Sequence, residues 1–144
     1  MKKSTQSPPM DPPDYGQSLH GLSINLLVRD ITKALHFQRE VLGTTLIYHD
    51  PDLIIAQWQG SQWMIHADHT YSHHALLPYT SPISVRGAGI EIRLHGCDPD
   101  IAEQKARAHG YEILVPAKDQ APHGLREAHI VDADGYVWVP DRHL

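Results

Sequence analysis

Histidine is the side chain through which this sequence could do most chemistry, because imidazole binds transition metals and exchanges protons near neutral pH. The chain of 144 residues contains 12 histidines, as many as its lysines and arginines together. The densest run is His66-Ala-Asp-His69-Thr-Tyr-Ser-His73-His74. Three of these rings, those of His66, His69 and His73, could converge on zinc or nickel.

Two features of this run weigh against a metal site. It leaves a predicted strand and enters a predicted loop, so no regular geometry holds three rings on one side, and it lacks the helical H-E-x-x-H spacing. Protonation of every histidine would add twelve positive charges to a formal net charge of −5. We therefore interpret most of the histidines as a solubility and charge-tuning feature, and keep His66 and His123 as functional candidates.

The rest of the composition excludes several classes of site and partner. Cys97 is the only cysteine, which rules out an intrachain disulfide and a thiolate-rich zinc site. The acidic balance argues against nucleic-acid binding. No run approaches the roughly 20 apolar residues of a membrane span, and no apolar stretch follows Lys2 and Lys3 as in a signal peptide. We expect a cytoplasmic protein with neither nucleic acid nor membrane as a partner.

The elements that must position the candidate residues follow the same order twice. In the first half, alternating apolar residues from Ser23 to Val28 predict a strand, and Asp30 begins a helix that stops at Gly43. Three further strands are predicted at Thr44–His49, Leu53–Gln59 and Gln62–Ala67. Turns between them come from Asp50-Pro51-Asp52 and Gly60-Ser61.

The second half repeats this order after a loop over Asp68–Gly87. A strand around Ile90–His95 precedes a helix that begins at Asp98, with Pro99 in its first turn, and stops at Gly110. Three strands are again predicted, at Tyr111–Pro116, Arg126–Val131 and Tyr136–Val139.

The fold class is therefore α+β, with two tandem βαβββ modules at about 21–67 and 88–140 inside one domain over 19–144. Neither module can bury its sheet alone, so we expect the two to pack together or to pair across a dimer. Residues 1–18 contain four prolines among small polar residues and are predicted to form a disordered arm.

Three segments resemble the vicinal-oxygen-chelate superfamily, which includes glyoxalase I, extradiol dioxygenases and the fosfomycin- and bleomycin-resistance proteins. They are Leu26-Leu27-Val28-Arg29-Asp30, Glu40-Val41-Leu42-Gly43 and Asp132-Ala133-Asp134-Gly135-Tyr136. The stretch 119–127, D-Q-A-P-H-G-L-R-E, resembles the D-x-P-W-G-x-R-E segment of the bleomycin-resistance-like branch, with His123 in place of tryptophan. The resemblance covers about residues 21–140. It implies two modules whose mixed sheets curl around a cleft, usually in a homodimer.

The resemblance also implies where a metal would bind in metal-dependent members. Those ligand positions fall at Ser23, at Met64 (or His66 if the register differs by two), at Glu91 and at Val139. At most two of the four can bind a cation, fewer than the three protein ligands of an open catalytic site. We therefore predict that the metal site is lost and that no cofactor is bound.

Two interpretations of Glu91 remain. Glu91 and His66 could face each other in the cleft as a general acid–base or hydrogen-bonding pair. Alternatively, Glu91 is an exposed strand residue or one held in an ion pair, for which Arg93 could be the partner.

The sequence thus predicts a metal-free protein that binds a small organic ligand, with sequestration of an antibiotic as one form of that activity. The alternatives are a metal-dependent lyase or dioxygenase with a displaced site, built on Glu91, His66 and a neighbouring histidine, or an accessory domain that uses the fold as a scaffold. Whether the protein is an enzyme stays open. Trp63 and Trp138 are assigned to the core. The predicted ligand-binding residues are Asn25, Tyr48, Trp58, Met64, His66, Glu91, Arg93 and His123.

Overall fold

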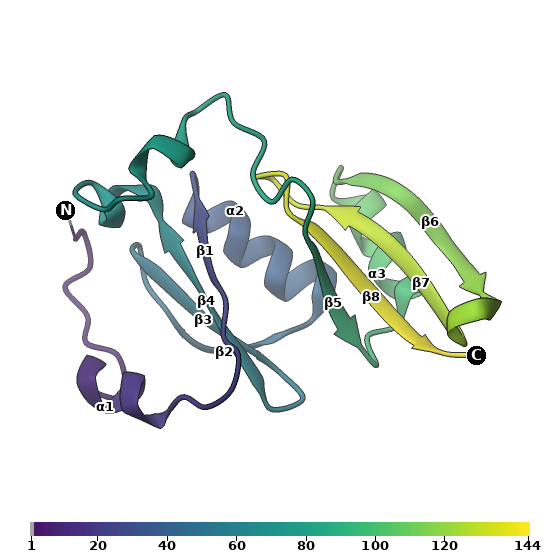
Figure 1. Cartoon of the computed structure of the whole chain (residues 1–144), viewed down its shortest axis with the longest axis horizontal. Coiled ribbons are helices and arrows are strands. Elements are labelled where there is room, and N and C mark those ends of the chain that lie inside the picture. Colours follow the sequence, from purple (N-terminus) through teal and green to yellow (C-terminus); the bar gives the residue numbers. More distant parts are fainter. Residues whose placement is uncertain (1) are drawn as a thin grey trace. The chain divides into compact units, whose positions relative to one another are not determined.

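A computed structural model describes residues 2–144 and divides the chain into two units. Unit 1 comprises the chain up to Leu35 together with Thr44–Ser84, and unit 2 comprises His36–Gly43 and Val85–Leu144. Each unit carries one four-stranded mixed sheet, and neither sheet closes on itself (Figure 1). The predicted α+β class, with the β-α-β-β-β order used twice, is confirmed.

Sheet A belongs to unit 1 and has the strand order β1-β4-β3-β2. β1 runs parallel to β4, and the other pairs are antiparallel. Because side chains alternate between the two faces of a strand, the register fixes what each face carries. The buried face of β4 presents Trp63 and Ile65, while the other face presents Gln62, Met64 and His66. The strands are β1 (Asn25–Val28), β2 (Thr45–His49), β3 (Leu53–Trp58) and β4 (Ser61–Ala67).

The predicted helix after β1 begins where the sequence places it. The Asp30 carboxylate accepts hydrogen bonds from the backbone N–H groups of Thr32 and Lys33, at 2.9 and 3.3 Å. The α-helical part, α2 (Ile31–His36), continues as a π-helix, η1 (Phe37–Leu42). Gly43 ends it with a φ of 68°, a left-handed conformation that glycine adopts at little cost.

The N-terminal arm, residues 2–19, contacts unit 1 through hydrogen bonds, and the disorder expected for residues 1–18 stays a prediction. Pro12–Ser18 form a short helix, α1, and the backbone N–H groups of Lys3 and Ser4 donate to the Asp52 carboxylate. In Figure 1 the arm runs from the N-terminus to α1 beside sheet A. Proline has no backbone N–H group, and the N–H groups of the other residues in such a segment can donate to an acceptor on another element. The arm can therefore lie against unit 1 without forming a strand or a long helix.

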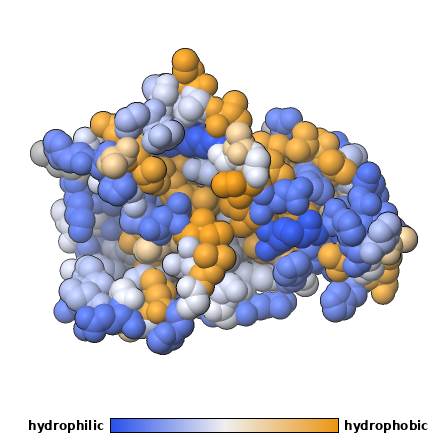
Figure 2. Space-filling model, in the orientation of Figure 1, coloured by the Kyte–Doolittle hydropathy of each residue, from blue (hydrophilic) through white to orange (hydrophobic). Residues whose placement is uncertain are grey.

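The long loop after β4 contains two short 3₁₀ helices, η2 (Asp68–Tyr71) and η3 (Leu77–Thr80). Beyond η2 it exposes several large apolar side chains, among them Leu77, Tyr79 and Ile83. Figure 2 shows apolar side chains projecting where this loop arches away from sheet A. Exposed apolar residues that gather in this way mark surfaces that other molecules cover.

Sheet B belongs to unit 2 and has the order β5-β8-β7-β6. Helix α3 (Pro99–Ala108) begins at Asp98, whose carboxylate accepts from the N–H groups of Asp100 and Ile101. Trp138 is fully buried, as predicted, and its indole N–H donates to Asp132 at 2.9 Å. The strands are β5 (Glu91–His95), β6 (Glu112–Gln120), β7 (Leu125–Val131) and β8 (Val137–His143), and η4 (Ala121–His123) joins β6 to β7.

Two of these strands are longer than predicted, and in both a proline lies inside. β6 is an edge strand with a register irregularity between Val115 and Lys118, so the missing N–H of Pro116 removes no ladder bond. Pro140 lies inside β8, an inner strand, opposite Leu94 of β5, and the pairs of β7 and β8 on either side of it keep one register. Both strands thus continue beyond the ends predicted for them, Pro116 and Val139.

Candidate functional site

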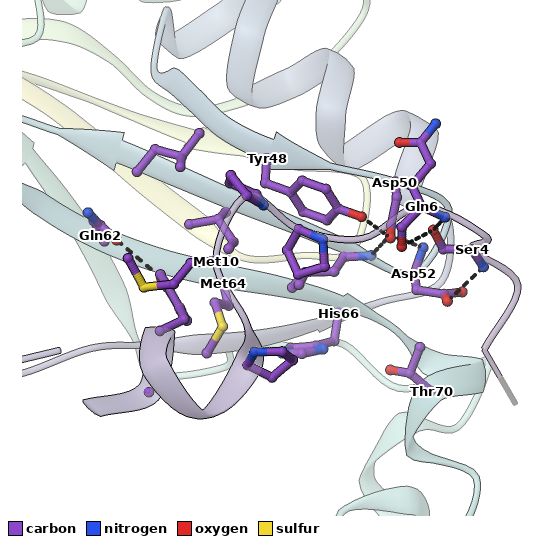
Figure 3. A pocket seen from close by; sticks show the side chains of 18 of the residues that line it. Ser4, Gln6, Met10, Tyr48, Asp50, Asp52, Gln62, Met64, His66 and Thr70 are labelled. Atoms are coloured by element: carbon purple, nitrogen blue, oxygen red, sulfur yellow. Dashed lines mark hydrogen bonds between the residues drawn. The ribbon is translucent and has the colours of Figure 1, made fainter. Parts of the chain in front are cut away.

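Unit 1 contains a cavity of about 540 Å³ between sheet A and the N-terminal arm. Its floor is the face of sheet A that carries Met64 and His66, and its roof includes Pro8, Pro9 and Met10 of the arm (Figure 3). This volume lies within the range of sites that hold small organic ligands.

Strand pairing explains why these floor residues face one space. Ile55 lies opposite Met64, and Leu53 lies opposite His66, so all four side chains project from the same face of the sheet. In β2 the register shifts between Leu46 and Tyr48, which brings both Ile47 and Tyr48 to the cavity.

Most polar groups in the cavity wall are already paired with one another. The Tyr15 hydroxyl donates to Oε1 of Gln62 at 3.1 Å, which ties α1 to β4. The Tyr48 hydroxyl donates to Asp50 at 2.6 Å, and burial together with this bond raises the pKa of Tyr48. A polar group that already has a hydrogen-bond partner gains little free energy from a hydrogen bond to a ligand. The cavity therefore offers a ligand few polar groups that lack a partner.

His66 is a polar residue of the cavity wall that is not paired in this way. Its ring packs edge-on against Tyr71 with centroids 5.2 Å apart, and its nitrogens make no hydrogen bond to any other residue in 2–144 that the structure shows. Burial lowers the pKa of His66, because a buried charge is poorly solvated. A neutral imidazole offers one donor and one acceptor to a molecule in the cavity.

Replacing His66 with glutamine is expected to change how stability depends on pH. In the unfolded chain His66 binds a proton near pH 6.5, whereas in the folded chain it does so only at lower pH. The unfolded state therefore gains stability as the pH falls below about 6.5, and the wild-type protein should lose more free energy of unfolding than His66→Gln between pH 7.5 and pH 5. Urea unfolding at a series of pH values measures this difference, and parallel curves for the two proteins would contradict it.

One end of the cavity is acidic. The Asp52 carboxylate accepts from the backbone N–H groups of Lys3 at 2.8 Å and Ser4 at 2.9 Å, and lies 2.6 Å from Nε2 of His69. Burial alone would raise the pKa of Asp52, but these hydrogen bonds outweigh it and lower the pKa to about 2. Asp52 is thus a carboxylate that stays ionised over the whole ordinary pH range.

The histidine run does not assemble a metal centre. His69 contacts Asp52, while the rings of His66 and His74 each pack against Tyr71. Within residues 2–144 no three His, Cys, Asp or Glu side chains are grouped so as to hold a metal ion. The run is divided between a strand and a 3₁₀ turn, which point its rings toward different partners.

In unit 2, one face of sheet B carries a network of charges centred on Arg93. Its guanidinium donates to Glu91 at 3.3 Å and to Asp141 at 3.1 Å, and it also donates to Glu127. His129 Nε2 lies 3.1 Å from Glu91. Glu91 is thus paired with Arg93 and His129 within unit 2, and its pairing with His66, a residue of unit 1, stays a prediction.

Five of the predicted ligand-binding residues do not line the cavity: Asn25, Trp58, Glu91, Arg93 and His123. Asn25 is exposed beside Met64, and His123 is exposed in η4. Trp58 lies on the face of β3 that carries Ala56, opposite to the face that lines the cavity. Of the predicted residues, Tyr48, Met64 and His66 do border the cavity.

Sequence reasoning missed the residues of the arm, including Met10 and Tyr15. No periodic pattern marks them, because a proline-rich segment has neither helical nor strand alternation. Asp52 was interpreted only as a turn residue, although a carboxylate following Asp50-Pro51 in a tight turn is well placed to accept backbone N–H groups.

Residues 21–139 match the Glyoxalase/Bleomycin resistance protein/Dioxygenase superfamily. Among curated proteins none matches the chain in sequence. None of the helices in residues 2–144 has the length and apolar character needed to cross a membrane.

Similar solved structures share the fold at low sequence identity. A glyoxalase-related enzyme from Fulvimarina pelagi is 18% identical, with a TM-score of 0.67 over 86% of this chain and 88% of that one. A protein of unknown function from Agrobacterium tumefaciens is 22% identical, with a TM-score of 0.67 over 89% and 99%. TioX from Micromonospora sp. ML1 is 22% identical, with a TM-score of 0.58 over 87% and 99%.

Proposed function

Because the chain belongs to the Glyoxalase/Bleomycin resistance protein/Dioxygenase superfamily, we propose that it binds a small organic molecule in the cavity of unit 1 and does so without a metal ion. The observation that carries this proposal is the cavity itself, about 540 Å³ of space over the sheet face that holds Met64 and His66. A preformed space of this kind, mainly apolar with few free polar groups, suits binding of an organic ligand.

The residues at the metal positions implied by the superfamily do not fit a metal ion. Met64 faces the cavity with a thioether, a weak ligand for hard or borderline cations, and Val139 is fully buried and has no ligand atom. Glu91 is engaged by Arg93 and His129. We therefore derive no metal-dependent step.

The cavity chemistry defines the class of ligand. The surface it exposes is mainly apolar and includes proline, methionine, leucine and isoleucine side chains, and the imidazole of His66, whose pKa burial lowers, is neutral at pH 7. The best ligand is therefore an uncharged, mainly apolar compound with one hydroxyl or carbonyl group placed against His66. Sequestration of an antibiotic of this class is one form that the activity would take.

The proposal is tested by isothermal titration calorimetry with pairs of ring compounds that differ by one hydroxyl or carbonyl group. We expect the polar member of a pair to bind the wild-type protein roughly three- to tenfold more tightly, which is the value of one buried hydrogen bond. In His66→Leu this preference should disappear, while the exposed-site control His123→Leu should keep it.

Two results would count against the proposal. The first is the absence of binding by any compound to a well-folded protein. The second is stoichiometric zinc, nickel, iron or manganese, measured by elemental analysis of protein purified without an affinity tag and lost in Glu91→Ala. That second result would favour a metal-dependent lyase or dioxygenase instead.

The proposal includes a homodimer. The exposed apolar side chains of Leu77, Tyr79 and Ile83 support it, since a second copy would remove them from water. Sedimentation equilibrium at micromolar concentration measures the oligomeric state.

A further inference from the structure

The roof of the cavity is made by a segment outside the superfamily match. The match begins at residue 21, whereas the arm of residues 2–19 supplies Pro8, Met10 and Tyr15 to the cavity wall. The cavity keeps its volume of about 540 Å³ beneath the arm. The arm therefore covers the cavity but does not fill it. A segment that blocked the site would occupy this volume, whereas a lid leaves it free for a ligand.

Two attachments hold the arm over sheet A. At its start, the backbone N–H groups of Lys3 and Ser4 donate to Asp52, and near its end the Tyr15 hydroxyl donates to Gln62. The first attachment uses an ionised acceptor and two donors, and such charge-assisted bonds are about twice as strong as neutral ones. The second attachment is a single hydrogen bond between neutral groups. The hydrogen bonds to Asp52 therefore contribute most of the stability of the closed arm.

The turn that carries Asp52 is itself fixed. Oδ1 of Asp50 accepts the N–H groups of Asp52 at 2.7 Å and Leu53 at 2.8 Å. Asp52 is in turn approached by Nε2 of His69 from η2, so the acceptor is positioned from two sides before the arm reaches it. Figure 3 shows Ser4, Asp50 and Asp52 gathered at one end of the cavity and Met10 and Met64 at the other.

The composition of the arm suits reversible closure. Pro8, Pro9, Pro12 and Pro13 restrict the backbone of the open state, which lowers the entropy lost when the arm closes. Pro8 and Pro9 lie on the apolar cavity and have no N–H group to leave unsatisfied there.

We propose that residues 2–19 form a strap over the cavity of unit 1, that Asp52 is the residue that holds it closed, and that ligands enter and leave only when the strap is released from Asp52. This inference rests on the proposed function for the identity of the site. In this proposal Asp52 controls how fast ligands enter and leave. His66 and the face of sheet A that lines the cavity bind the ligand.

The experiment is amide hydrogen exchange, measured by NMR on the full-length protein without ligand. We expect the amides of Lys3 and Ser4 to be protected in the wild-type protein. In Asp52→Ala their exchange should accelerate by about tenfold or more, the consequence of losing at least one net charge-assisted hydrogen bond. Asp52→Asn, which keeps the side-chain volume, should show a smaller acceleration.

Matched controls separate the strap from a general loss of structure. Lys3→Ala removes a side chain but keeps the backbone N–H, so it should leave the protection unchanged. The amides of β3 and β4 should exchange equally in all variants, which shows that sheet A is intact. For a compound that binds in calorimetry, stopped-flow association and dissociation rates should both rise by about the same factor as the amide exchange in Asp52→Ala.

The strap and the proposed function fail in different ways. Lys3 and Ser4 amides that exchange in the wild-type protein as fast as in an unstructured peptide would overturn the strap, whether or not a ligand binds. Ligand rates that stay unchanged in Asp52→Ala while the amides are released would also overturn it. Protected amides that Asp52→Ala releases, together with no binding by any compound, would support the closure and remove the proposed ligand function.

Discussion

Replacing Arg93 with alanine is expected to lower the free energy of unfolding by about 3 kcal/mol at neutral pH, because it removes the guanidinium that pairs with two buried carboxylates. The contact of Asp141 with Nδ1 of His95, at 2.9 Å, stays in place beside them. The side chains of Glu127 and Asp141 are 4% and 1% exposed, and both accept hydrogen bonds from the same guanidinium. Burial alone would raise the pKa of Glu127, but the hydrogen bond and charge of Arg93 hold it below its ordinary value. Urea unfolding followed by circular dichroism measures the loss.

Arg126 offers a matched control. Its side chain is 25% exposed and that of Arg93 is 28% exposed, and each guanidinium bridges two or more carboxylates. The partners of Arg126 are Asp100 and Asp119, which are 46% and 63% exposed, so water can solvate them when the arginine is removed. Arg126→Ala should therefore cost less than about 1 kcal/mol.

The pH dependence of the Arg93→Ala effect follows from the depressed pKa of Glu127. The stabilisation by Arg93 is fully present above the unfolded pKa of about 4.3 and is lost as the pH falls through the lower folded value. The gap between wild type and Arg93→Ala should thus narrow below pH 4. Adding Glu127→Gln to Arg93→Ala should recover part of the stability at pH 7.

A small stability change in Arg93→Ala together with a loss of ligand binding would contradict this interpretation. It would instead support the sequence-based prediction that Arg93 binds ligand. The two roles are separable because one appears in unfolding and the other in calorimetry.

The sequence was most informative where local chemistry decides the structure. Asp30 and Asp98 begin their helices because a short carboxylate side chain caps free backbone N–H groups wherever the following residues turn into a helix. Met64 and His66 face one side of sheet A because alternation with the buried Trp63 and Ile65 leaves no other arrangement.

The sequence was least informative where distant segments decide it. Trp58 follows the run Leu53-Ile54-Ile55-Ala56, which is apolar on both faces of β3, so alternation does not reveal which face meets the cavity. Only the pairing of Ile55 with Met64 settles this. The arm is a second case, since its attachment joins Ser4 to a carboxylate 48 positions away through backbone groups that every sequence has.

Replacing Met64 with tryptophan is expected to weaken ligand binding at least about a hundredfold, because the larger side chain occupies the space over the centre of the cavity floor. Met64 lies in the middle strand pairing of that floor, opposite Ile55 and one alternation from His66. The cavity can accept the indole, so the free energy of unfolding should change by less than about 1 kcal/mol, unlike overpacking in a filled core. Calorimetry with a compound that binds the wild-type protein measures the effect.

Met64→Leu is the control, since leucine has nearly the volume of methionine and should change the affinity only a few-fold. If Met64→Trp binds as tightly as wild type, the ligand does not occupy the cavity of unit 1, whatever its affinity. Together with Arg93→Ala, this variant locates the binding site, because each change acts in one unit only. Loss of binding in Met64→Trp with retention in Arg93→Ala, measured under conditions where both proteins are folded, places the ligand on sheet A and leaves the charge network of sheet B a structural role.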